Sequence, residues 1–218
     1  MTVDEIVSSL RGRAAEQAAP RNPLASLAAS GHLGIGHVRR LLAGERAVQD
    51  NEIAAFATLV GRFPRDPAVG FFLSLASVVN ATRPALLRAE RALGESGHVP
   101  ETDVHAAGAH AFSGYLCWLA MRASLSGAAL ALYTNLLAWC GSCGRLAAAL
   151  RNLPDVPPEV TSYLASYEVA PPDLLDTALA VARQGAAEGE CPQRAEREAG
   201  LVLGYLDLFW QSASVHSS

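Results

Sequence analysis

Lysine is absent from this 218-residue chain, so all 17 of its positively charged side chains are arginines. A lysine Schiff base and the lysine of a Walker-type phosphate loop are therefore excluded. Charged residues make up only 17% of the sequence and the net charge is −4. We therefore expect no basic face and no nucleic-acid partner. Hydrophobic residues make up 50%, which is ample for the core of a single domain over residues 1–218.

The N-terminal stretch MTVDEIVSSLRGRAAEQ has acids and arginines where a secretory signal has its apolar segment. We therefore expect a cytoplasmic protein. The four cysteines, Cys117, Cys140, Cys143 and Cys191, are then expected to be reduced and mostly buried thiols.

Sustained strand-like alternation between hairpin turns is also missing. Instead, apolar positions recur with helical spacing between proline and glycine breaks. The pattern predicts one all-α domain. Its helices are expected over residues 2–16, 24–29, 35–62, 67–93, 102–125, 127–150, 159–167, 171–184 and 192–212.

The most apolar predicted helix is 127–150, because no charged residue occurs between Ala123 and Gly144. The run is long enough to cross a membrane, but Asn, Thr, Ser and Gly residues interrupt it. We interpret it as a core helix enclosed by the others, with no membrane partner. Asn135 and Trp139 are four residues apart and share one of its faces. They either pack in the core or line an enclosed pocket.

Several segments resemble, in the same order, motifs of the TenA/thiaminase II family. They are NPLASLAASGHL (22–33), the Ser126-Gly127 step, ALYTNLLAWCGSCGRL (131–146), YLASY (163–167) and YLDLFWQSA (205–213). The resemblance covers about residues 20–213. It implies a heme-oxygenase-like (TenA-like) helical bundle with a buried central helix and an enclosed small-molecule pocket.

The resemblance also implies catalytic positions. The family's cysteine nucleophile falls on Asn135, whose amide cannot attack a carbon in place of a thiolate. The carboxylate of the early long helix falls on Glu45. The closing glutamate falls on Leu206, and Asp207 stands next to it, about 100° round the helix. The candidate catalytic residues are therefore Glu45, Asn135 and Asp207.

The substrate-binding positions of the family fall on aromatic residues. The tyrosine four residues after the nucleophile is Trp139, the aromatic residue of the helix before the central one is Phe112, and the family tyrosine at Tyr167 is kept. The resemblance implies that these rings hold an aromatic ligand.

Related cofactor-dependent proteins need ligands that this sequence lacks. Residues 1–19 contain no histidine for an axial heme bond. No Glu-x-x-His occurs between Ala68 and Leu93, where a diiron site needs one. Cys140-Gly-Ser-Cys143 lies inside a predicted helix, unlike redox Cys-x-x-Cys pairs, and no second pair completes a zinc site. We expect no metal and no cofactor.

Three functions remain open. The first is an enzyme of specialised metabolism that acts by acid/base or polarising groups and is not a thiaminase. The second is a non-catalytic ligand-binding or regulatory protein. The third is a divergent hydrolase of aminopyrimidines, which are thiamin-related compounds. In each, the partner is a small molecule in an enclosed pocket.

We also predict a homo-oligomer, because family relatives assemble through helix faces and this chain is rich in apolar residues. Light scattering should give a mass that is a multiple of the chain mass of 22.9 kDa. A monomer mass at micromolar concentration would contradict this prediction.

Overall fold

The structure is a computed structural model, and it describes residues 2–18, 21–94, 107–153 and 155–215. Within these ranges the regular elements are all α-helices and there is no β-strand, which confirms the predicted all-α class. The helices are α1 (Val3–Ala18), α2 (Pro23–Ala29), α3 (Ile35–Arg62), α4 (Ala68–Ala92), α6 (Ala107–Arg122), α7 (Leu125–Leu150), α8 (Pro158–Ala165), α9 (Pro172–Ala187) and α10 (Pro192–Ser214).

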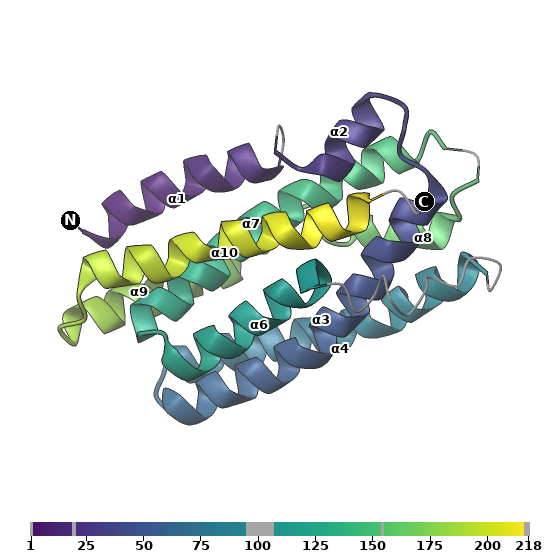
Figure 1. Cartoon of the computed structure of the whole chain (residues 1–218). Coiled ribbons are helices and arrows are strands. Elements are labelled where there is room, and N and C mark those ends of the chain that lie inside the picture. Colours follow the sequence, from purple (N-terminus) through teal and green to yellow (C-terminus); the bar gives the residue numbers. More distant parts are fainter. Residues whose placement is uncertain (1, 19–20, 95–106, 154, 216–218) are drawn as a thin grey trace.

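Helix α7 is enclosed by its neighbours, as its apolar sequence predicts. It packs against α1, α2, α8, α9 and α10, and Figure 1 shows it running between α1 and α10. Arg145 and Ala148 are its exposed residues, and both lie near its C-terminal end. A helix without an exposed polar face gains most of its stability from burial on nearly every side.

The boundary between α6 and α7 differs from the prediction. One helix was expected to run from 102 to 125, and its start lies outside the described residues. The structure ends α6 at Arg122 and begins α7 at Leu125. Ser124 has an extended backbone and its hydroxyl accepts a hydrogen bond from the Gly127 amide at 3.1 Å, so it caps α7.

A second group of helices, α3, α4 and α6, packs beside α7 and α10. Helix α3 contacts α4, α6 and α10, and α10 also contacts α6 and α7. Figure 1 shows α3, α4 and α6 together on one side of α10. Helices α3 and α6 of this second group therefore face α10, which belongs to the first group formed by α7 and its neighbours.

Two glutamates hold the N-terminus of α7. Glu190 accepts hydrogen bonds from the amides of Leu125 and Ser126, both at 2.7 Å. Glu198 accepts from the amide of Ser124 at 2.9 Å and from its hydroxyl at 2.6 Å. The first amides of a helix have no partner within it and carry the positive end of its dipole, so carboxylates stabilise it there. These contacts connect α7 to α10 and to the segment before α10.

Helix α4 is the described helix that is long and apolar enough to cross a membrane. Its most apolar window has a mean hydropathy of 1.3, and 28% of that window is buried. Length and composition of one helix do not establish a membrane span, and the cytoplasmic location stays a prediction.

Candidate functional site

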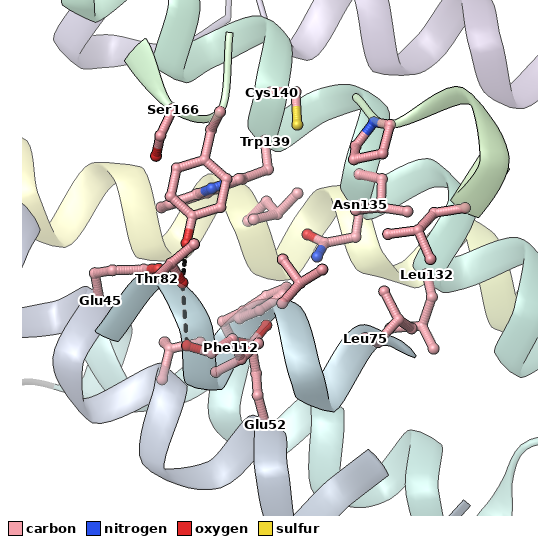
Figure 2. Close-up of a pocket in the computed structure, with 18 of the residues that line it drawn as sticks. Glu45, Glu52, Leu75, Thr82, Phe112, Leu132, Asn135, Trp139, Cys140 and Ser166 are labelled. Carbon is pink, nitrogen blue, oxygen red and sulfur yellow. Dashed lines mark hydrogen bonds between the residues drawn. The ribbon is translucent and has the colours of Figure 1, made fainter. Parts of the chain in front are cut away.

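A cavity of about 120 Å³ lies between the two groups of helices (Figure 2). One water needs about 10–15 Å³ on this measure, so the space suits a ligand of about ten non-hydrogen atoms. Its walls come from α3, α4, α6, α7, the start of α9, α10 and the segment after α8. The polar and thiol side chains that line it are Glu45, Glu52, Thr82, Asn135, Cys140, Ser166 and Tyr167.

Glu45 enters this cavity from α3 and is only 6% exposed. Its Oε1 accepts hydrogen bonds from the Tyr163 hydroxyl at 3.0 Å and from Gln49 Nε2 at 3.3 Å. Burial raises the pKa of Glu45 to about 7, although these two hydrogen bonds favour the ionised form. Its second oxygen, Oε2, accepts no hydrogen bond from any residue that the structure describes.

Glu52 is a second carboxylate at the same cavity, and the sequence analysis missed it. It follows Glu45 by seven residues, or about two helical turns, so both side chains leave the same face of α3. Burial, and then repulsion by Glu45, raise the pKa of Glu52 to about 8. No described residue donates a hydrogen bond or an ion pair to Glu52. The spacing of two helical turns from Glu45 was the signal in the sequence from which Glu52 could have been predicted.

Asn135 faces the cavity from α7, across from the two glutamates (Figure 2). Its Oδ1 is buried and has no hydrogen-bond partner among the described residues. An unpaired buried amide oxygen costs on the order of 1–3 kcal/mol. A donor on a bound molecule would remove that cost.

Aromatic rings form the remaining wall. Trp139 stacks on Trp210 with 5.0 Å between ring centroids and meets Tyr167 edge to face at 6.0 Å. Tyr167 is fixed by its hydroxyl, which donates to Thr82 Oγ1 at 2.8 Å (Figure 2). The ring centroid of Phe112 lies 6.5 Å from that of Phe209, which also lines the cavity. The predicted residues Phe112, Trp139 and Tyr167 therefore all border one cavity with Glu45 and Asn135.

Asp207 is the predicted site residue that the structure places elsewhere. Its carboxylate accepts a hydrogen bond from Gln17 Nε2 at 2.5 Å, on the side of α10 that faces α1. Leu206 lines the cavity instead. The two positions differ by about 100° round the helix, and the polar contact with α1 decides which side Asp207 takes. Asp207 cannot reach a ligand in this cavity.

The cavity also contains a thiol, on Cys140. Burial raises the pKa of Cys140 to about 12, and that of Cys143 well above its usual value. A protonated thiol is a poor nucleophile, so neither side chain replaces the family's cysteine at neutral pH. Both are buried, as expected of core cysteines, whereas Cys117 and Cys191 are exposed, contrary to the expectation of mostly buried thiols.

Comparison with protein-family models, curated proteins and solved structures finds no match to this chain. The resemblance to the TenA/thiaminase II family is therefore carried by its sequence motifs alone. The chemistry of the site has to be argued from the residues that line the cavity.

Those residues offer hydrogen-bond acceptors to a ligand. Glu45 Oε2, both oxygens of Glu52 and Asn135 Oδ1 lack donors among the described residues. No arginine lines the cavity in the part of the chain that the structure describes. A molecule that brings N–H groups or positive charge satisfies these acceptors, while the rings hold its apolar body.

Proposed function

We propose that this chain is a TenA-like protein whose cavity binds a small aromatic compound bearing a basic nitrogen. On this proposal it is an enzyme of specialised metabolism rather than a thiaminase, and Glu45 is its acid/base group. The observation that carries the proposal is that Glu45, a buried side chain at a ring-lined cavity, has one carboxylate oxygen that accepts no hydrogen bond from a described residue, and that no described arginine lines this cavity. Such a site favours cations with flat apolar bodies.

The proposed chemistry is proton transfer without a covalent intermediate. A general base works best when its pKa lies near the working pH, and the pKa of Glu45 is raised to about 7. Asn135 occupies the position at which the family has its nucleophile, and its amide is able only to orient or polarise the ligand. Glu45 would take a proton from the ligand, or from water beside it, and return it later.

Replacing Glu45 with glutamine tests this role, because the substitution keeps the shape and removes the charge. We expect the affinity for 4-amino-2-methylpyrimidine, measured by titration calorimetry at pH 7.5, to fall at least about tenfold. That corresponds to roughly 1.4 kcal/mol and to the loss of one charge-assisted hydrogen bond. The Tyr163 hydroxyl keeps an acceptor in the amide oxygen of the new side chain, so the pocket keeps its form.

The matched control is Glu90→Gln. Glu90 is a partly buried glutamate on α4 that pairs with Arg46 at 3.6 Å and does not line the cavity. Its replacement should leave the affinity unchanged. Equal affinities for the natural protein and Glu45→Gln would remove Glu45 from the site and refute the proposal.

Turnover separates an enzyme from a non-catalytic binding protein. Native mass spectrometry of the purified protein identifies a retained small molecule, and incubation of that molecule with fresh protein shows whether it is converted. Conversion that Glu45→Gln abolishes supports the enzyme. Binding without conversion supports the ligand-binding alternative, and release of a free aminopyrimidine supports the hydrolase.

A further inference from the structure

If the ligand carries only one basic group and Glu45 binds it, Glu52 has no role in the site. It is a half-buried carboxylate at the wall of the cavity, and no described residue neutralises it. The nearby arginines of α3 and α4 are engaged outside the cavity: Arg83 pairs with Asp50 at 2.5 Å, and Arg46 pairs with Glu90. The protein itself therefore supplies no counter-charge to Glu52 within the described residues.

A ligand with a single cation would leave one of the two carboxylates without a partner. That carboxylate would have to take up a proton or remain a costly unpaired charge, and closing the cavity over a ligand removes more water from it. A second basic group on the same ligand satisfies both carboxylates at once. The unpaired buried oxygen of Asn135 adds an acceptor on the opposite wall, so the whole polar lining favours a molecule rich in donors.

The placement of the two glutamates sets where the basic groups belong. Seven residues along a helix correspond to about 10 Å between Cα atoms. Glu45 and Glu52 therefore approach the cavity as two separate anchors on one wall rather than as a single clamp (Figure 2). The rings of Phe112 and Trp139 line the space beside them, and the volume suits about ten non-hydrogen atoms.

We propose that Glu52 is a second binding residue, and that the ligand is a dibasic aromatic compound with nitrogens at opposite ends of one ring. Glu45 binds one nitrogen and Glu52 the other, while the aromatic wall contacts the ring. This inference rests on the proposed function, since it assumes that Glu45 already binds a basic nitrogen in the cavity. It narrows the ligand class from basic aromatic compounds to dibasic ones.

The test uses two probes of nearly equal shape. In 1,4-bis(aminomethyl)benzene both ends of the ring carry an ammonium group, whereas in 4-ethylbenzylamine one of them is replaced by a methyl group. Titration calorimetry at pH 7.5 should show that the natural protein binds the diamine at least about tenfold more tightly. Glu52→Gln should remove this preference and leave the affinity for 4-ethylbenzylamine within about threefold. Glu90→Gln should keep the preference.

The outcomes separate this inference from the proposed function. In one outcome the monoamine binds in a Glu45-dependent way and the diamine binds no more tightly; in another, Glu52→Gln keeps the preference for the diamine. In either case Glu52 does not bind the second nitrogen, and the proposed function stands. If neither amine binds at millimolar concentration, both proposals are overturned. Diamine preference that depends on Glu52 but not on Glu45 overturns the proposed role of Glu45 and this inference with it.

Discussion

Replacing Gly185 with alanine is expected to destabilise the protein by about 2–4 kcal/mol, the range of severe overpacking in a core. Gly185 is buried in α9, and an added Cβ would lie inside van der Waals contact with the Glu190 carboxylate and the Ser126 hydroxyl. It would also lie 2.9 Å from the Ser126 amide nitrogen, which is backbone. Neither the Glu190 carboxylate nor the Ser126 backbone can move without loss of the hydrogen bond from the Ser126 amide to Glu190, which holds the N-terminus of α7.

Thermal and urea unfolding measure this effect, and a chain of this size should lose roughly 5–15 °C in melting temperature. The matched control is Gly114→Ala in the exposed middle of α6, where an added Cβ meets nothing within 4 Å. That substitution should stabilise the protein by about 0.5–1 kcal/mol through helix propensity. A Gly185→Ala variant as stable as the natural protein would show that α9 and the start of α7 do not pack this closely.

The glycines also show why helix packing is hard to read from sequence. Gly114 and Gly185 look alike in local structure, since both lie inside helices away from proline residues. Only Gly185 lies against another helix, and that helix begins 60 residues earlier in the chain. Helix positions follow from local spacing and from proline and glycine breaks, which is why the predicted ranges agree closely with the described helices. Which glycine is irreplaceable depends on contacts between distant residues.

The same distinction between local spacing and contacts with distant residues applies to the cavity. Glu45, Asn135 and Trp139 were placed there by motif spacing, and helical spacing alone put Asn135 and Trp139 on one face of a helix. Glu52 was within reach of that reasoning, because it repeats the position of Glu45 after about two turns. The side that Asp207 takes was not, because it depends on Gln17, which is 190 residues away. The helical period determines which residues share a face of a helix. Contacts with distant residues decide which face points into the cavity.

Buried carboxylates that bind a ligand should also make the empty protein less stable at high pH. Glu45 and Glu52 have folded-state pKa values of about 7 and about 8, both raised from an ordinary value of 4.5. Well below pH 4.5 both groups are protonated in the folded and unfolded chains, and ionisation costs the fold nothing. As pH rises, the unfolded chain loses these protons first, so stability falls from about pH 4.5 until pH passes the folded values of 7 and 8.

Other titratable groups in or next to the cavity do not obscure this fall in stability. Burial raises the pKa values of Tyr163, Tyr167 and Cys143 above their ordinary values, so these side chains stay protonated from pH 5 to pH 9. Charges elsewhere titrate equally in the natural protein and in a variant altered only at the two glutamates. The difference in unfolding free energy between the two proteins therefore isolates the pair.

The double variant Glu45→Gln/Glu52→Gln should be about as stable as the natural protein at pH 4.5 and about 3 kcal/mol more stable at pH 9. The estimate lies below the full value of the two pKa shifts because Glu52 is only partly buried and is screened by solvent. Urea unfolding at pH 4.5, 7 and 9 measures the difference. Asp176→Asn/Glu196→Gln removes the same number of charges outside the cavity and should show no such dependence. A difference that does not grow with pH would mean that the two carboxylates ionise freely in the folded protein and that burial does not raise their pKa values.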